Sequence, residues 1–146
     1  MNTYKSNDPN QANLRLELHH FTHLTFNFIS NIKGGQPLSL SGEKLEVKAF
    51  VEKAKNKIIV ELSFNTTAKE GEEKIFNLSA GYRGVFAYTE TSEPQSIAGF
   101  AKTNAPAIIY PFLRASIASM TLAAGVPPMT LPVINFTTFP VVVEER

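Results

Sequence analysis

Three histidines near the start of this chain are the first residues that could do chemistry. His19, His20 and His23 lie close together in the sequence, and imidazole nitrogens are common metal ligands. Because side chains alternate between the two faces of a strand, we expect His19 and His23 to point one way and His20 the other. No cysteine or carboxylate pair lies beside them to complete a ligand set. We therefore interpret all three as strand-surface residues and predict no metal site.

The other reactive side chains form no catalytic pattern. The chain has no cysteine, so thiolate nucleophiles and the usual structural zinc sites are excluded. Gly34-Gly35 lacks the Lys-Ser/Thr of a phosphate-binding loop. We interpret Arg83 and Arg114 as structural residues, paired with a carboxylate or a helix-end carbonyl. No spacing places a nucleophile beside a base, so we predict no catalytic residue, no cofactor site and a protein that is not an enzyme.

The composition predicts one domain that spans residues 1–146. Of its residues 43% are apolar and 18% are charged, and the net charge is +1, which favours neither disorder nor nucleic-acid binding. The opening, MNTYKSNDPNQ, is polar and resembles no secretion signal, so we expect a flexible arm over residues 1–12 and a cytoplasmic protein. Residues 115–143 carry no charge, but glycines and prolines interrupt them, so we expect no membrane insertion.

Alternating apolar residues predict four strands. They fall on even positions across residues 14–28, and similar patterns follow across 45–52, 58–64 and 75–88. Residues 31–42 are rich in glycine and are predicted to form a loop, while Lys55-Asn56 and Lys69-Glu70-Gly71 are predicted turns. Strands joined by short turns pair as antiparallel neighbours, which predicts a four-stranded antiparallel meander sheet.

The helices are predicted after the strands. Pro94 is suited to the first turn of a short helix through Phe100, and Asn104 and Pro106 are expected to interrupt it before a longer helix that ends near Ala124. Apolar residues at three- and four-residue steps predict the buried face of this longer helix, and Pro111 is expected to kink it. The face consists of Ile109, Leu113, Ile117, Met120 and Ala124.

These elements predict an α+β fold in which a long, kinked helix of the C-terminal half packs on one face of the sheet. The other face of the sheet then needs a partner. Two apolar residues, Phe50 and Ile59, sit at outward positions of their strands, which favours self-association.

The segment after the helix combines a loop backbone with core-like side chains. Gly125 is predicted to end the helix, and Pro127 and Pro128 prevent its continuation. Further prolines follow among apolar side chains that would suit a binding surface as well as a core. These are Met129, Leu131, Val133, Ile134, Phe136 and Phe139.

Short motifs in this region resemble one family. The long helix carries Pro111-Phe112-Leu113-Arg114 and Ile117-Ala118-Ser119-Met120, its exit reads Gly125-Val126-Pro127-Pro128, and the loop closes on Asn135-Phe136. Weaker matches are Gly84-Val85-Phe86 and Leu24-Thr25-Phe26. In these motifs the chain is similar to the SecB-type protein-export chaperones, small α+β proteins that hold unfolded polypeptides without ATP.

The resemblance implies a cytoplasmic holdase that assembles as a homo-oligomer, a dimer of dimers. It also shows departures from the family. His23, Asn27 and Ser79 replace the carboxylates through which such chaperones contact the SecA motor, and from the end at Arg146 we expect neither the family's second helix nor its basic tail. This pattern disfavours SecA as a partner and is similar to relatives attached to toxin–antitoxin pairs.

The predicted function is the binding of unfolded or pre-secretory client polypeptides in an apolar groove. A different interpretation remains open, in which the same side chains form a lid over the core between helix and sheet. A second function also remains open, that of an adaptor which binds a single partner such as an antitoxin. The predicted client-binding residues are Phe26, Phe28, Val126, Met129, Leu131, Ile134, Phe136 and Phe139.

Overall fold

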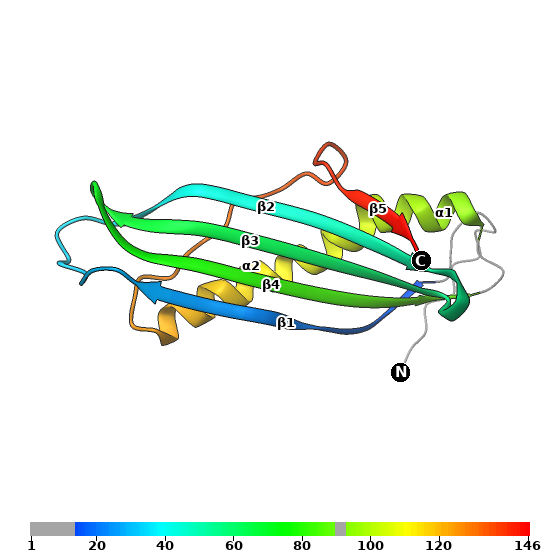
Figure 1. Ribbon diagram of the computed structural model, residues 1–146, viewed down its shortest axis with the longest axis horizontal. Coiled ribbons are helices and arrows are strands. Elements are labelled where there is room, and N and C mark those ends of the chain that lie inside the picture. The colour runs from blue at the N-terminus through cyan, green and yellow to red at the C-terminus, as the bar shows by residue number, and fades with distance from the viewer. Residues whose placement is uncertain (1–13, 90–92) are drawn as a thin grey trace.

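The computed structural model describes residues 14–89 and 93–146, so the predicted arm over residues 1–12 lies outside the described part. One sheet contains β1 (Leu14–Phe28), β2 (Leu38–Glu52), β3 (Lys57–Glu70), β4 (Glu73–Tyr88) and the short β5 (Val142–Glu145). Its strand order is β1-β4-β3-β2-β5. The long strands lie in front of the helices in Figure 1, which gives the fold two layers. We call the face that the helices cover the inner face and the opposite face the outer face.

The predicted meander is wrong in two respects. β1 pairs with β4 instead of β2, so over residues 29–37 the chain passes from the edge strand β1 to β2, on the far side of β4 and β3. β5 pairs in parallel with Lys48–Val51 of β2, so the sheet has five strands and is mixed. The predicted hairpins that join β2 to β3 and β3 to β4 are confirmed. The α+β class therefore holds, with a different strand order.

β1 contains two bulges that change where its side chains point. The pairing with β4 shifts between Leu16 and Leu18 and again between Phe21 and His23. A bulge adds one residue and reverses the alternation of the faces beyond it. His23 therefore shares the outer face with His20, whereas His19 lies on the inner face, which corrects the predicted arrangement of the histidines.

β2 begins at Leu38, well before its predicted start at Leu45. Residues 31–37 of the predicted loop do lie outside the strands, whereas Gly42 belongs to a bulge inside β2. Gly42 has a φ of 62° beside the register shift between Ser41 and Lys44, a conformation that suits glycine.

The helical layer is one continuous segment from Pro94 to Ala123. It consists of α1 (Pro94–Gly99), a π-helical turn (η2, Phe100–Asn104) and α2 (Ala105–Ala123). Asn104 and Pro106 therefore do not interrupt it. The Ala105 N–H donates to the Phe100 carbonyl across the π-helical turn, and Pro106 follows in the first turn of α2. By length and composition alone this 30-residue segment could cross a membrane, a property that it shares with buried core helices.

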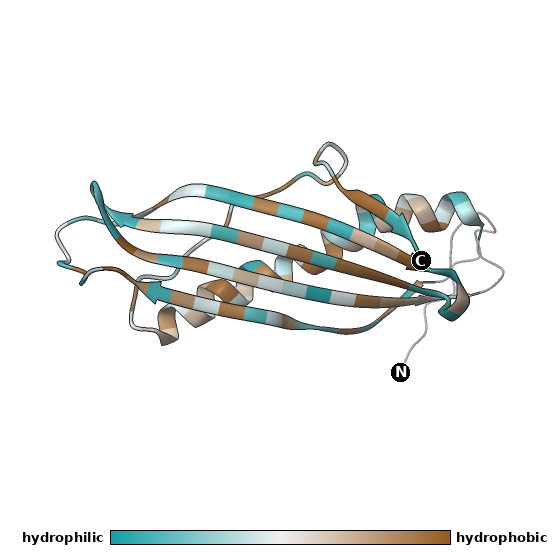
Figure 2. Cartoon of the chain, in the orientation of Figure 1, coloured by the Kyte–Doolittle hydropathy of each residue, from teal (hydrophilic) through white to brown (hydrophobic). Residues whose placement is uncertain are grey.

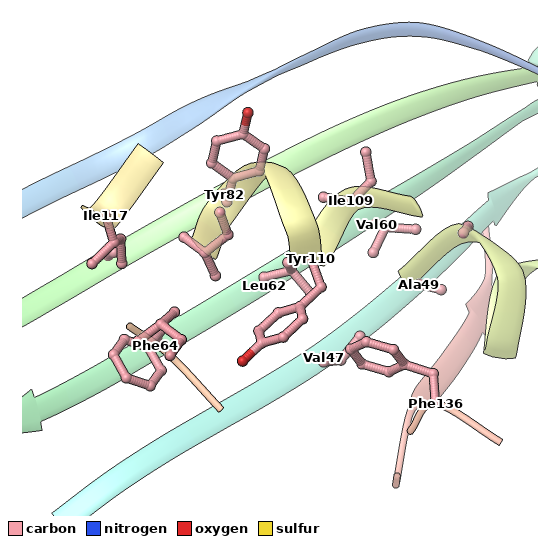
Figure 3. Close-up of a cluster of buried hydrophobic side chains, with 14 of the residues drawn as sticks. Val47, Ala49, Val60, Leu62, Phe64, Tyr82, Ile109, Tyr110, Ile117 and Phe136 are labelled. Carbon is pink, nitrogen blue, oxygen red and sulfur yellow. The ribbon is translucent and has the colours of Figure 1, made fainter. Parts of the chain in front are cut away.

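One stripe of α2 packs against the inner face. Ile109, Leu113 and Ile117 are fully buried, as predicted, but the stripe continues to buried Thr121, while Met120 is 43% exposed and Ala124 is exposed. Steps of four residues from Ile109 lead to Thr121, which explains the difference. Figure 3 shows Ile109 and Ile117 in one cluster with Val60, Leu62 and Phe64, which lie on β3.

Candidate functional site

The loop after α2 turns several of its predicted client-binding side chains inward. Val126, Met129, Leu131 and Phe136 are each at most 5% exposed and belong to the hydrophobic core. Such side chains cannot touch another polypeptide from their present positions. The prediction that these four residues contact a client directly is therefore corrected. They cover the core instead, which was the other interpretation left open by the sequence.

Polar groups of α2 hold the loop in this inward position. The Met129 N–H donates to Thr121 Oγ1 at 2.9 Å, and this hydroxyl donates to the Ile117 carbonyl at 2.8 Å. Arg114 Nε donates to the Leu131 carbonyl at 3.0 Å. The bonds to the Met129 N–H and the Leu131 carbonyl satisfy two loop backbone groups that packing would otherwise leave without a partner. The single charged residue of α2 is therefore structural, as predicted, although its partner is a loop carbonyl and not the predicted carboxylate or helix-end carbonyl.

Tyr110 supplies another of these connections. Its hydroxyl donates to the Pro132 carbonyl at 2.5 Å, and its ring meets the edge of Phe136 with the centroids 5.6 Å apart. Figure 3 shows both rings in the buried cluster with Val47. Burial raises the pKa of the Tyr110 hydroxyl above its ordinary value, and nearby Arg114 opposes the shift. The hydroxyl is thereby kept in the neutral form that can donate.

The other predicted client-binding residues remain accessible but lie at two places. Phe28 is 52% exposed at the end of β1, and Phe26 is partly buried beside it, both packed against Phe76. Ile134 and Phe139, also partly buried, belong to the loop that leads into β5. Because β1 and β5 form opposite edges of the sheet, these residues do not line a single groove.

An exposed apolar surface on α2 was missed by the sequence reasoning. We call it the helix patch, and its side chains are between 39% and 63% exposed. The signal was present in the sequence, because α2 carries one charge, Arg114, over 19 residues, so its solvent-facing side had to be uncharged. The helix patch consists of Ile108, Phe112, Met120 and Leu122.

Phe112 connects the helix patch to β1. Its ring stacks on His19 with the centroids 4.0 Å apart, and His19 Nδ1 lies 2.6 Å from the Tyr82 hydroxyl. Ile29, just beyond β1, is also exposed. Apolar side chains are thus accessible on α2 and at the end of β1.

The outer face carries the positions where the resemblance expected carboxylates. His23 Nε2 lies 3.1 Å from the Ser79 hydroxyl, and Asn27 pairs with Asn77 across β1 and β4. Arg83 forms an ion pair with Glu61 at 2.7 Å, so its predicted structural role is confirmed. Among residues 14–89 and 93–146, no group of three or more metal-binding side chains gathers in one place.

Comparison with known protein families gives a match over most of this chain. The family described as "Preprotein translocase subunit SecB" matches residues 39–140. The protein-export protein SecB of Dinoroseobacter shibae is 26% identical over 132 residues, which cover 88% of this chain and 76% of that protein. SecB of Anaplasma marginale (strain Florida) is 32% identical over 101 residues, which cover 68% of this chain and 58% of that protein.

A similar fold occurs in a solved structure from Mycobacterium tuberculosis. It is a SecB-like chaperone in complex with a ChAD peptide from the HigA1 antitoxin. The two folds superpose with a TM-score of 0.70 over 83% of this chain and 90% of that one, at 15% sequence identity. At this identity the likeness concerns the fold.

Proposed function

Because this chain belongs to the SecB family, whose members are chaperones and not enzymes, we propose that it is an ATP-independent holdase for unfolded or pre-secretory polypeptides. We place this activity in the cytoplasm. The observation that carries the proposal is the apolar surface exposed at the end of β1, where Phe28 is 52% and Ile29 53% exposed. Unfolded chains expose the apolar segments that folded proteins bury. An exposed apolar surface therefore binds unfolded chains in preference to folded proteins.

We propose that clients contact the accessible part of the predicted set. Phe28 and Phe26 would hold one client segment at the end of β1, and Ile134 and Phe139 would hold another near β5. The buried loop residues would support these contacts from beneath. Burial of one apolar side chain stabilises a complex by about 1.5–3 kcal/mol, so several separate contacts are needed for useful affinity.

An oligomer would supply those separate contacts. We propose that the helix patch is the surface through which copies of the chain associate, in a dimer of dimers as the resemblance implies. The uncharged face of α2 supports this proposal, because an exposed apolar stripe on a helix favours packing against another such stripe. Linked sites then bind one long client with greater avidity than a single site does.

The first test is protection of an aggregating client without ATP. We expect the chain to suppress light scattering by several unrelated unfolded proteins, and Phe28→Asp to lose most of this protection because a carboxylate cannot replace the exposed ring. Asn27→Asp is the matched control. It adds the same charge to the residue that precedes Phe28 in β1, whose side chain lies on the outer face. Equal loss in both variants, or full protection by Phe28→Asp, would contradict the assignment of Phe28.

A second candidate is a chaperone dedicated to one partner. Similarity in fold to a chaperone solved with an antitoxin peptide favours this possibility. The lack of carboxylates at His23, Asn27 and Ser79 favours it too, because it disfavours handover to SecA. The breadth of protection distinguishes the two candidates. A general holdase protects many unfolded proteins, whereas a dedicated chaperone protects one.

A further inference from the structure

β5 covers only part of the sheet edge that β2 forms. It pairs in parallel with Lys48–Val51, whereas β2 begins at Leu38. In the part of the chain that the structure describes, no strand lies beside residues 38–47 of β2 on this side. The backbone donors and acceptors of an edge strand are available for pairing with another extended chain. β5 therefore shows how such a chain docks on an edge that continues beyond it.

The direction of its amides decides which side chains of β5 reach the core. The Arg146 N–H donates to the Val51 carbonyl at 2.9 Å. Because N–H groups alternate in direction along a strand, the amides of Glu144 and Val142 also face β2. The side chain of Val143 lies between them, points inward and packs partly buried against the core. An occupant of this edge therefore needs an apolar side chain between two residues whose amides pair with β2.

Apolar side chains of β2 lie beneath β5. On the inner face Ala49 is fully buried and Val51 is 4% exposed. On the outer face Phe50 is 5% exposed, and the Arg146 guanidinium lies 3.7 Å from the centre of its ring. This part of the edge is therefore more stable when an extended segment covers it than when it faces water.

Few buried contacts hold β5 on this edge. Three of its four residues are exposed. The ion pair of Lys53 with Glu145 joins two exposed side chains, and that of Arg146 with Glu52 spans 4.0 Å, so both contribute little. In Figure 2 β5 changes from brown to teal along its length, so its far end has little apolar surface to bury.

The loop that leads into β5 is held more firmly. Phe136 is 4% exposed, and its ring meets the edge of the Phe139 ring with the centroids 5.7 Å apart. The Phe139 N–H donates to the Asn135 carbonyl at 3.0 Å, which closes a turn before Pro140. β5 is thus a weakly held strand attached to a fixed loop. This arrangement lets it leave the edge while the core stays intact.

We propose that the edge of β2 beneath β5 is a docking site for an extended, β-branched segment of a client polypeptide, which replaces β5 there. The segment runs parallel to β2 and places a valine or isoleucine where Val143 packs. Ile134 and Phe139, the proposed client contacts of the loop, precede β5 in the chain, so a client held by them can continue onto this edge. The inference rests on the proposed chaperone function and identifies the kind of client segment that the protein recognises.

The exchange of one strand for another costs little. Each hydrogen bond between β5 and β2 is replaced by an equivalent bond to the client, so few backbone groups are left without a partner. A longer segment gains further bonds along residues 38–47 of β2, where β5 does not reach.

A reversible disulfide between β5 and β2 tests the proposal in the full chain. Lys48 pairs with Val142, and the chain has no cysteine of its own. Adjacent strands lie about 4.8 Å apart, within the range that a disulfide spans. In Lys48→Cys/Val142→Cys, oxidation therefore holds β5 on the edge and dithiothreitol releases it.

The probe is a labelled synthetic peptide in which valine and threonine alternate before two glutamates, followed by fluorescence anisotropy. We expect saturable binding to the reduced variant and binding at least about tenfold weaker to the oxidised one, because the locked edge is not available. Thr67→Cys/Asn77→Cys is the matched control, since its disulfide joins β3 to β4. It should bind the peptide equally well in both forms.

Methylation of the peptide backbone tests the direction of docking. In the place of β5 the valines point inward, as Val143 does, and the threonine amides face β2. A methyl group on the nitrogen of the central threonine should weaken binding at least about tenfold, because it removes a donor and obstructs the pairing. The same group on the central valine points away from β2 and should leave the affinity unchanged. The reverse pattern indicates an antiparallel segment and would contradict the replacement of β5.

A variant that loosens β5 should have the opposite effect to the disulfide. Arg146→Ala removes the contact with Phe50 and should strengthen peptide binding about two- to fivefold. Arg15→Ala is the matched control, because it removes an exposed arginine from β1 at the opposite edge of the sheet. Thermal unfolding of each variant shows whether the fold is kept.

Several results would overturn the proposal. They are the absence of saturable binding to the reduced variant, equal peptide affinity in its oxidised and reduced forms, and equal client protection in those two forms. Binding of a peptide with the sequence of residues 140–146, without binding of the valine–threonine peptide, would also overturn it, because the edge would then receive β5 of a second copy. Absence of client protection in the unmodified chain, with peptide binding intact, would contradict the proposed chaperone function instead.

Discussion

Gly84 shows how one absent side chain sets the distance between α2 and the sheet. A Cβ added to Gly84 would lie 2.3 Å from Ile109 Cδ1, well inside van der Waals contact. Ile109 is fully buried at this contact, so neither residue has room to move. The glycine of the Gly84-Val85-Phe86 motif therefore serves packing between the two layers.

We expect Gly84→Ala to reduce the free energy of unfolding by about 1–3 kcal/mol, the usual effect of overfilling a packed core. Urea unfolding followed by circular dichroism measures the change. Gly99→Ala is the control, because no atom lies within 4 Å of a Cβ at that helical position. It should leave stability unchanged or raise it by about 0.5–1 kcal/mol. An equal loss in both variants would contradict the packing role of Gly84.

Tyr110 makes the contact between α2 and the loop sensitive to alkali. Burial raises the pKa of this hydroxyl, and burial also raises the pKa of Tyr82, where a hydrogen bond with Ser116 opposes the shift. A phenol whose pKa is higher in the folded than in the unfolded chain stabilises the fold fully below the unfolded pKa. That contribution is lost as the pH rises through the folded pKa.

We therefore expect the free energy of unfolding to fall as the pH rises above about 10, the pKa of an unfolded tyrosine. Tyr110→Phe should show a smaller fall, since it has no hydroxyl to ionise there. It should also be less stable near neutral pH because the Pro132 carbonyl loses its donor. Urea unfolding across this pH range measures both effects, and equal pH dependence in the two proteins would contradict the assignment.

Among the elements, the strands and helices were predicted well because their signals are local. Alternation from Leu14 to Phe28 and steps of four residues from Ile109 depend only on neighbours in the sequence. Strand order, the bulge before His23 and the pairing of β5 depend on residues far apart, so local patterns could not reveal them. The inward side of the loop was equally hidden, since bonds from Tyr110 and Thr121 decide it.

β5 is the least secure strand. It has four residues, most of them exposed, and pairs on one side only, with β2. Beyond its hydrogen bonds it is held by Val143, which packs partly buried against the core, and by surface ion pairs such as Lys53 with Glu145, which contribute little. The end of the sheet that contains Phe50 therefore depends on a weakly held element.

We expect the amides of Val142–Glu145 to exchange with deuterium far faster than those of Ile58 and Val60, which lie in the central strand β3. Arg146→Ala should speed this exchange further, because it removes the contact with Phe50. Hydrogen exchange followed by mass spectrometry measures both. Lys44→Ala removes an exposed cation elsewhere on β2 and should leave β5 unchanged. Protection of β5 equal to that of β3 would contradict the assignment.

At the scale of the whole molecule, two exposed faces have different characters. The helix patch is apolar and uncharged, whereas the outer face combines one apolar row with charged side chains on both sides. A uniform apolar surface favours packing between copies, and a mixed surface favours a partner with matching charges. The proposed association through the helix patch would therefore leave the outer face accessible.

We expect Met120→Lys to reduce the mass of the assembly, because a buried lysine in the helix patch has no partner for its charge. Native mass spectrometry across a range of protein concentrations measures the change. Asn65→Lys adds the same charge on the outer face and should keep the larger mass. An unchanged assembly in Met120→Lys would show that the copies meet elsewhere.

The pairing of β1 with β4 also affects how the protein is made. Leu14 lies opposite Tyr88, so β1 leaves the ribosome well before β4 and does not have this neighbour until β4 has been synthesised. The hairpins of β2, β3 and β4 can form meanwhile, because each needs only the strand next to it. During this interval the alternating leucine and phenylalanine residues of β1 are themselves an unpaired apolar segment. A nascent copy of this chain thus resembles the polypeptides that a finished copy is proposed to hold.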